Sequence, residues 1–396
     1  CDPAFYDDPW DTYRWLRANA PLYRDEINDL WVVSRYQDVF DISRAPDLYC
    51  SSRGVRPKLD VPLSLISVDD PEHTRQRRLI NRGFTPRRVR ELMPHIRELS
   101  EQLIDEIQGR GEIDFVEDMA IHVPIIVIAE LLGLDPQTRM KMYRWSDAMM
   151  AGDGHTEADD PVLVQAAEAF LEYGEMCAAL IAERRRSPTD DLISVLTQKF
   201  DEGELGGSDD PDEPMGDDEL NLFLAVLLIA GNETTRNAIT GGLLALSRFP
   251  GEHERLVEHL DDDHFVDLAV DELIRWVSPV MNFTRTVTRD HEYRGVQLHD
   301  GDRILMLYQS ANRDEDVFER PDDIILDREP NPHLAFGIGT HFCLGANLAR
   351  LEVKTVFQAL LRRLPDIHVP DGAHRTRGAS TLVIALKHLP AVFTPT

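Results

Sequence analysis

The pattern of hydrophobic and polar positions predicts a mainly α-helical chain with a small β region. Apolar residues recur at helical spacing over most of the chain between Pro71 and Phe249. The expected helices are 11–19, 71–82, 86–109, 117–132, 136–150, 161–186, 190–200, 217–249, 266–277 and 344–364. The expected strands are 30–36, 283–287, 304–307 and 382–386, and the Pro-containing stretch 55–68 is expected to be a loop.

The segment from Asp217 to Phe249 contains no proline and is apolar on almost every side between Leu222 and Ala230. We therefore expect one helix, about 50 Å long, through the middle of the core. The stretch 201–219 before it is rich in glycine and acidic residues, which favours a solvated loop over a domain boundary because one long helix follows. We expect a single domain over residues 1–396.

Composition narrows the possible partners and the compartment. Forty-two Lys and Arg against 71 Asp and Glu give a net charge of −29, which disfavours nucleic acid and anionic lipid as partners. The four cysteines are scattered and form no CxxC pair, as in proteins of a reducing cytosol. No apolar stretch is long enough to span a membrane, and no signal sequence opens the chain. We expect a cytoplasmic monomer without a membrane span.

The strongest chemical signal is a cysteine at the start of the helix expected over 344–364. Cys343 follows Gly337 and Gly339 and precedes Gly345 in the sequence Phe-Gly-Ile-Gly-Thr-His-Phe-Cys-Leu-Gly. Glycines allow the backbone to approach a bulky flat group and to adopt angles that other residues avoid. The helix N-terminus stabilises a thiolate, which is the metal-ligating form of cysteine.

A second signal interrupts the long central helix at Ala-Gly-Asn-Glu-Thr-Thr, residues 230–235. Burying Glu233 costs free energy unless the carboxylate is paired or hydrated. The Thr234 hydroxyl can bond back to a backbone carbonyl and loosen the helix. Gly231 removes a side chain from the same turn, so we expect room for a small ligand here.

Two further groups of charged residues fit the same picture. Glu272 and Arg275 are three positions apart on an expected helix and can form an ion pair. His73 and Arg77 are four apart on another helix, and Arg285 lies on an expected strand.

Together these segments resemble the cytochrome P450 family of haem-thiolate monooxygenases over essentially the whole chain. The resemblance implies the P450 fold and one haem b, with Cys343 as the axial ligand of the iron and Phe336 beside it. It also implies haem propionate contacts from His73, Arg77, Arg285 and His341. The other residues placed at the haem by the resemblance are Ala230, Gly231, Gly337 and Gly345.

The same resemblance implies catalytic and structural roles. Thr234 is expected to hydrogen-bond dioxygen at the iron, and Glu233 to relay protons. Glu272, Arg275 and Arg328 are expected to form a buried network that supports the cysteine loop. The implied reaction is insertion of one atom of O2 into a C–H bond, with electrons from NAD(P)H through a ferredoxin reductase and a ferredoxin.

The substrate is expected to be a bulky hydrophobic molecule: a sterol, a terpenoid or a branched lipid. Candidate pocket residues lie in 55–68, 150–175 and several apolar segments, and the selected ones are Ala225, Ile229, Val280, Met281, Phe283 and Leu382. Two alternatives remain open. One is a haem-thiolate enzyme that uses peroxide or isomerises its substrate, and the other is a non-catalytic haem protein that senses gas or carries haem.

A basic surface near the cysteine loop is the expected docking site for an acidic ferredoxin. Its candidate residues are Arg75, Arg78, Arg82, Arg87, Arg88, Arg90, Arg350 and Lys354. Arg75, Arg78 and Arg82 are expected to point into solvent.

Overall fold

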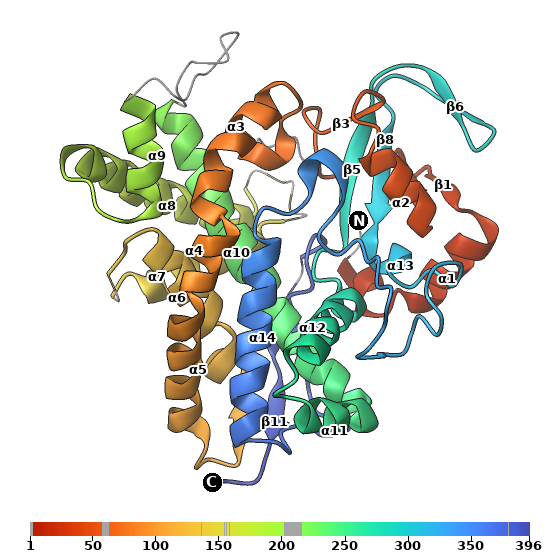
Figure 1. Ribbon diagram of the computed structural model, residues 1–396. Coiled ribbons are helices and arrows are strands. Elements are labelled where there is room, and N and C mark those ends of the chain that lie inside the picture. The colour runs from red at the N-terminus through yellow and green to blue at the C-terminus, as the bar shows by residue number, and fades with distance from the viewer. Residues whose placement is uncertain are drawn as a thin grey trace.

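The computed structural model describes residues 3–57, 63–135, 137–153, 155, 157, 159–201, 216–378 and 380–396. Its longest element is helix α10 (Asp217–Arg248), which crosses the middle of the molecule (Figure 1). Three acidic residues occupy the first turn of α10, where the helix dipole favours negative charge. Helices α6, α7, α8, α12 and α14 all contact α10, so the predicted central position of this helix is confirmed.

The helices cover the greater part of the chain. The α-helices are α1 (Trp10–Asn19), α2 (Tyr36–Ser43), α3 (Glu72–Asn81), α4 (Pro86–Glu91), α5 (Met93–Ile107), α6 (His122–Leu131), α7 (Arg139–Ala151), α8 (Pro161–Arg186), α9 (Leu192–Asp201), α10 (Asp217–Arg248), α11 (Pro250–Glu258), α12 (Asp263–Val277), α13 (Tyr308–Ala311) and α14 (Ala346–Arg363). Short 3-10 turns are η1 (Pro3–Asp7), η2 (Ser64–Ser67), η3 (Arg82–Phe84) and η5 (Gly339–His341), and η4 (Val116–Ala120) is a π-helical turn.

The β structure is small and lies mainly to one side of the helices (Figure 1). The strands are β1 (Leu22–Asp25), β2 (Leu30–Val33), β3 (Tyr49–Cys50), β4 (Glu112–Asp114), β5 (Asn282–Val287), β6 (His291–Tyr293), β7 (Val296–Leu298), β8 (Arg303–Leu307), β9 (Thr376–Arg377), β10 (Leu386–His388) and β11 (Pro390–Val392). The largest sheet has the order β1-β2-β8-β5-β3, in which only β2 and β8 run parallel. Three two-stranded sheets pair β10 with β9, β11 with β4, and β6 with β7.

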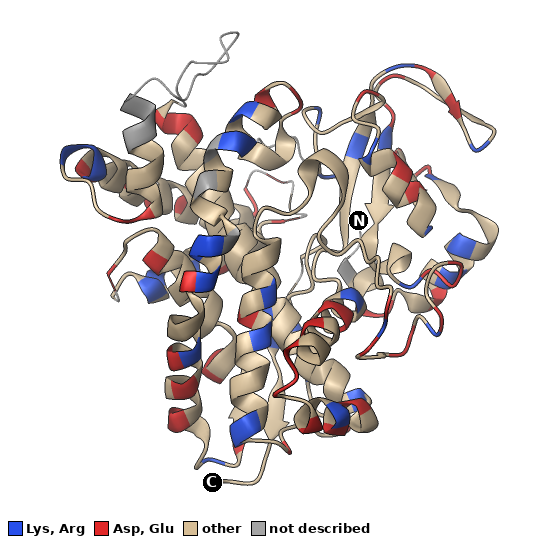
Figure 2. Ribbon diagram, in the orientation of Figure 1, with Lys and Arg blue, Asp and Glu red and all other residues tan. Residues whose placement is uncertain are grey.

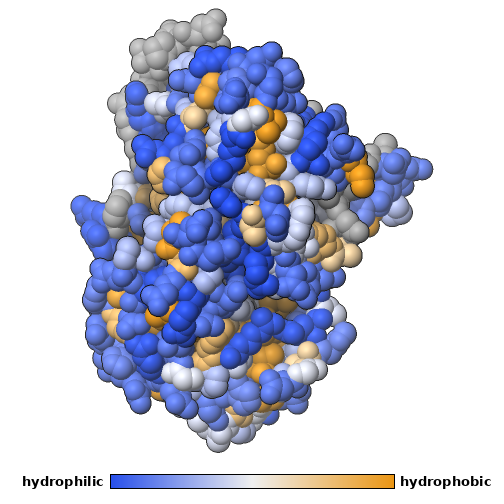
Figure 3. Space-filling view, turned by 90° about the vertical axis from the view of Figure 1, so that its right-hand side faces the viewer, coloured by the Kyte–Doolittle hydropathy of each residue, from blue (hydrophilic) through white to orange (hydrophobic). Residues whose placement is uncertain are grey.

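The apolar core is divided between the helices and the sheet. One large cluster of buried residues joins helices from both halves of the chain, and two smaller clusters pack around the five-stranded sheet. The face shown in Figure 3 is mostly hydrophilic, with hydrophobic residues in small separate groups. Within the described ranges, no helix has the length and apolar character needed to cross a membrane.

Several predicted boundaries of helices and strands were wrong. In each case, the hydrogen bonding of backbone N–H groups explains the difference. The expected strand 30–36 ends at Val33, and α2 begins at Tyr36, where the Asp314 carboxylate accepts the Tyr36 N–H at 2.7 Å. The expected helix 86–109 divides into α4 and α5 just before Pro94, whose ring cannot donate a backbone hydrogen bond.

The expected strand 382–386 forms only an isolated bridge at Val383, and β10 begins at Leu386. The Ser380 hydroxyl accepts the N–H groups of Leu382 and Val383 instead of a strand partner. The acidic loop expected over 201–219 lies largely outside the described residues.

Candidate functional site: a cysteine loop facing the centre of the long helix

The cysteine loop is shaped by glycines and by its own backbone hydrogen bonds. Gly337 and Gly339 have φ angles of 68° and 75°, which side chains rarely tolerate. A Cβ atom on Gly339 would lie 2.6 Å from the Ser43 carbonyl oxygen, so this position also requires close backbone packing. The Cys343 N–H donates to the Phe336 carbonyl at 2.9 Å and closes the loop just before α14.

The surroundings of the Cys343 sulfur act on its pKa in opposite directions. Burial raises the pKa of the thiol, which is the largest effect. The backbone N–H groups of Gly345 and Ala346 and the nearby Arg77 and Arg350 lower that pKa. The helix start therefore lowers the pKa of Cys343, as predicted. In the protein alone, however, burial raises this pKa by more than the helix start lowers it. A bound metal ion would shift this balance, because a coordinating thiol loses its proton.

The middle of α10 has an open face. Ala230 is exposed and Thr234 is partly exposed, although most of their neighbours on the helix are buried. The two residues are four positions apart and therefore share one face of the helix. The Thr234 hydroxyl donates to the Ala230 carbonyl at 2.7 Å, as the sequence suggested.

The expected role of Gly231 was wrong. A Cβ atom on Gly231 would lie 2.6 Å from Cδ1 of Ile128 on α6. The missing side chain therefore allows α6 to pack against α10. The open face of α10 instead follows from Ala230, which has a small side chain.

Glu233 is buried and fully engaged with protein groups. Its carboxylate pairs with Arg236, one turn further along α10, and accepts weak hydrogen bonds at 3.3 Å from Ser146 and Asn232. Burial raises the pKa of Glu233, while the positive charges of Arg236 and Lys387 act against this rise. The sequence analysis missed Arg236, although its i, i+3 spacing from Glu233 is the same signal that identified Glu272 and Arg275.

Four basic residues from different parts of the chain form a second cluster. The rings of His73 on α3 and His341 in the cysteine loop are 4.3 Å apart. Ser51, which the sequence analysis also missed, lies 3.1 Å from Nε2 of His341. Burial is the main cause that lowers the pKa of each basic group, and it brings the pKa of His341 to about 3. The members of this cation cluster are His73, Arg77, Arg285 and His341.

The cation cluster is poorly neutralised by the protein. Neither ring nitrogen of His73 has a hydrogen-bond partner among the described residues. The Arg285 guanidinium donates to one neutral acceptor, the Thr284 carbonyl, at 2.9 Å. Such groups are costly to bury alone, so they fit a ligand that carries carboxylates. A cysteine sulfur at a helix start, an open helix face and a cluster of buried basic groups with little negative charge beside them together fit a haem group.

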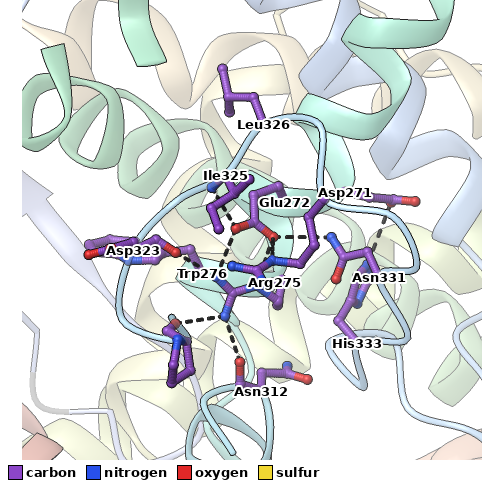
Figure 4. A network of polar contacts seen from close by, with 12 residues as sticks. Asp271, Glu272, Arg275, Trp276, Asn312, Asp323, Ile325, Leu326, Asn331 and His333 are labelled. Carbon is purple, nitrogen blue, oxygen red and sulfur yellow. Dashed lines mark hydrogen bonds and ion pairs between the residues drawn. The ribbon is translucent and has the colours of Figure 1, made fainter. Parts of the chain in front are cut away.

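A third cluster is centred on Glu272 and Arg275 (Figure 4). Arg275 donates to Glu272 at 2.7 and 2.9 Å, and Arg328 donates to the same carboxylate at 3.0 Å. Arg275 also donates to the backbone carbonyls of Asn312, Pro321 and Asp323. Glu272 in turn accepts the Ile325 N–H at 2.9 Å. This support network fixes the segment 312–331 that leads into the cysteine loop.

The candidate pocket residues divide into two groups. Ile229, Val280, Phe283 and Leu382 are partly exposed and remain candidates. Ala225 and Met281 were wrong choices as lining residues, because both are packed against protein. Ala225 is 2% exposed and Met281 is 0% exposed. The Met281 sulfur lies 2.9 Å from the Arg377 guanidinium. Met281 lies just before β5, and its side chain is buried against Arg377.

The basic surface near the loop is more neutralised than its sequence suggests. Figure 2 shows Lys and Arg on α3, α4 and α14. Arg75 was wrongly expected to point into solvent, because it is paired with Glu72 and Glu219 and its side chain is 9% exposed. Arg87, Arg88, Arg350 and Lys354 also pair with acidic residues. Arg78 and Arg90 are exposed, and the Arg82 side chain lies outside the description.

A mostly helical fold with a cysteine loop near unpaired cations and an open core helix defines a haem-thiolate protein. Comparison with known proteins agrees with this class. The family model for cytochrome P450 matches residues 162–387. The chain belongs to the cytochrome P450 family, and it is a monooxygenase with haem b as its cofactor.

Curated relatives and solved structures refine this placement. The chain is 40% identical to a "Steroid C26-monooxygenase" of Mycolicibacterium smegmatis, over 97% of this chain and 92% of that protein. It is also 40% identical to a protein of the same name in Mycobacterium tuberculosis, over 97% and 93% of the two chains. The crystal structure of CYP109E1 from Bacillus megaterium in complex with testosterone superposes with a TM-score of 0.88 and 31% identity, over 99% of both chains.

Proposed function

We propose that this P450 hydroxylates a steroid, or a lipid of similar size and shape, at an unactivated C–H bond. The observation that carries this proposal is the 40% identity, over nearly the whole chain, to two steroid C26-monooxygenases. The partly exposed apolar residues Val280, Phe283 and Leu382 support a hydrophobic pocket. When bound, haem b supplies the activation of dioxygen that such a reaction requires.

We assign the haem-holding roles to residues of the loop and of the cation cluster. The Cys343 sulfur would bind the iron, and the N–H groups of Gly345 and Ala346 hold this sulfur in place. His73, Arg77, Arg285 and His341 would bind the two propionate carboxylates, which supply the negative charge that the cluster lacks. The open face at Ala230 would lie against the other side of the flat group.

Thr234 would make a hydrogen bond on the open face of α10, and Glu233 would relay protons. Because the Thr234 hydrogen is donated to the Ala230 carbonyl, the hydroxyl oxygen remains free to accept a hydrogen bond on the open face. Glu233 directly precedes Thr234 on α10, and its carboxylate is held by Arg236 and Ser146. Replacing Thr234→Ala should leave haem and substrate binding intact but lower the product formed per NADH consumed. Unchanged coupling would remove Thr234 from this role.

Electrons would come from NAD(P)H through a ferredoxin reductase and a ferredoxin, and we expect a cytoplasmic single-domain monomer. The exposed Arg78 and Arg90, near the cysteine loop of a chain with a net charge of −29, support docking of an acidic carrier here. Cys50, Cys177 and Cys343 are free thiols in the described structure, which suits a reducing compartment. A single large apolar cluster contains residues from Leu65 to Phe393 and supports one domain.

Substrate-induced spectral shifts of the ferric protein test the proposed function. A C27 sterol ketone, which has a C26 carbon, is expected to displace water from the iron and shift the haem absorption to shorter wavelength. Testosterone, which lacks the side chain, should bind more weakly, and a linear fatty acid should give little shift. If the fatty acid bound more tightly than the sterol, the steroid proposal would be wrong.

A further inference from the structure

A buried arginine lies where three separate parts of the chain meet. Arg56 donates through Nε and Nη2 to both carboxylate oxygens of Asp153, at 3.1 and 3.2 Å. Its Nη1 donates to the Asn282 side-chain oxygen at 2.9 Å, and its Nη2 also donates to the Thr381 hydroxyl at 2.8 Å. Each nitrogen of the guanidinium therefore bonds to protein, and four of its five N–H groups have an acceptor.

Asp153 is held equally firmly from its other side. It follows the C-terminal end of α7, and its carboxylate accepts the Thr381 N–H at 2.9 Å and the Thr381 hydroxyl at 3.0 Å. The Arg56 and Asp153 side chains are only 6% and 12% exposed. We call the group Arg56, Asp153, Asn282 and Thr381 the α7 latch.

The α7 latch borders the candidate pocket. Asn282 directly precedes Phe283, and Thr381 directly precedes Leu382. Helix α7 is attached a second time near its middle, where Ser146 contacts Asn232 and Glu233 on α10. Helix α7 therefore spans from the centre of α10 to the segment that contains Leu382. These two polar attachments add to its packing against α6 and α8.

We propose that Arg56 is a positioning residue that fastens the end of α7 to the segment around Thr381 and thereby controls how fast bulky molecules reach the haem pocket. This inference rests on the proposed function, because it assumes that the substrate occupies the space beside Phe283 and Leu382. A buried ion pair contributes little net stability over an apolar packing, but removing one partner leaves a buried charge unpaired. The α7 latch thus holds the end of α7 against the segment around Thr381, and the loss of a single partner should weaken this attachment.

Ligand binding rates of the holoenzyme test the α7 latch without any knowledge of the substrate. Clotrimazole is a bulky azole that binds haem iron, and cyanide is a small ion that binds the same iron. In Arg56→Met, association and dissociation of clotrimazole should both accelerate at least about tenfold. The variant loses the ion pair with Asp153 and all four hydrogen bonds, and one hydrogen bond to a charged group is by itself worth about that factor. Cyanide rates should change less than twofold.

Two further variants separate gating from loss of structure. Thr381→Val removes hydrogen bonds to Asp153 and Arg56 but keeps the ion pair, so it should give a smaller acceleration of the same kind and stands in if Arg56→Met does not fold. Arg53→Met is the matched control, because Arg53 is half exposed and pairs with Asp300 instead. Its rates should equal those of the wild type.

The outcomes are distinct. Equal acceleration of clotrimazole and cyanide would mean general loosening of the site and would overturn the proposal, as would unchanged clotrimazole rates in Arg56→Met and Thr381→Val. If Arg56→Met lowered the melting temperature but left the ratio of the clotrimazole rate to the cyanide rate unchanged, Arg56 would have a purely structural role and the proposal would also be wrong. If the azole rates respond but sterols give no spectral shift, the α7 latch stands and the steroid proposal fails.

Discussion

Two clusters of buried charge flank the cysteine loop, and they differ in how completely the protein pairs their groups. In the support network, Glu272 and Arg275 are 0% exposed, and Glu272 accepts from two arginines, a backbone N–H and the Asn331 amide. In the cation cluster, His73 makes no hydrogen bond among the described residues and has only the Asp70 carboxylate, 3.8 Å away, as a charged partner. The Arg285 guanidinium donates to a neutral carbonyl. In the support network, other residues of the chain pair every charged group that is named here. The cation cluster fits negative charge supplied by a ligand.

This difference separates residues that build the fold from residues that hold a ligand. Buried charge is stable only when it is paired, so a fully paired cluster acts on the free energy of unfolding of the protein alone. An unpaired cluster lowers that free energy until its ligand binds, and it then contributes to ligand affinity. Changes to the two clusters should therefore act in opposite directions on the haem-free protein.

The largest expected effect is an all-or-none change in the haem spectrum. Cys343→His should abolish the thiolate-specific absorption band of the reduced carbon monoxide complex. Because the cation cluster still binds the propionates, this variant should retain haem after gel filtration. Survival of the band would show that Cys343 is not the iron ligand.

Breaking the support network should cost most in stability. Glu272→Gln leaves Arg275 and Arg328 buried without their counter-charge, so the free energy of unfolding of the haem-free protein should fall by about 3–5 kcal/mol. Urea unfolding measures this change. Glu254→Gln, at an exposed carboxylate on α11, is the control and should stay within about 0.5 kcal/mol of the wild type. A loss of less than about 1 kcal/mol in Glu272→Gln would contradict the assigned role.

The same measurement on the cation cluster should have the opposite sign. Arg285→Leu replaces an unpaired buried cation by an apolar side chain, which should stabilise the haem-free protein by about 1–4 kcal/mol. In the holoenzyme, transfer of haem to apomyoglobin should become at least about tenfold faster, because a propionate loses its partner. If Arg285→Leu destabilised the haem-free protein, Arg285 would belong with the support network.

The smallest effect is a pH dependence of the haem-free protein. Burial lowers the pKa of His73 in the folded state below its ordinary value of 6.5. The unfolded chain therefore binds a proton first as the pH falls, so stability is lost below about pH 6.5, by at most about 1.4 kcal/mol per pH unit. His73→Gln should reduce this slope, and bound haem should reduce it in the wild type. Equal slopes in wild type and His73→Gln would exclude His73 as the cause.

Features that are local in the sequence could be predicted from it. The glycine-flanked Cys343, the Glu272–Arg275 spacing and the proline-free run of α10 each identify themselves within a few residues. Arg328 and the cation cluster were identified through resemblance to a family, because their partners are distant in the chain. The roles of these residues in binding and catalysis remain predictions.

Features that depend on packing could not be predicted. The side chain missing at Gly231 makes room for Ile128, about a hundred residues earlier, and no local pattern encodes that contact. The pairing of Arg75 with Glu219 and of Arg56 with Asp153 likewise joins distant segments. The contact of Met281 with Arg377 joins segments about a hundred residues apart in the same way.

The order of elements along the chain has a consequence for synthesis on the ribosome. Helix α10 is apolar on most of its surface, and two of its partners, α14 and β10, follow it by about a hundred residues or more. At about 5–20 residues per second, the nascent chain carries a partly uncovered core helix for roughly 5–20 seconds, because only the partners that precede α10 are then available. Haem binding through Cys343 cannot begin before this interval ends, because Cys343 lies just before α14. Slower translation of 249–345 would lengthen this interval and favour aggregation over haem incorporation.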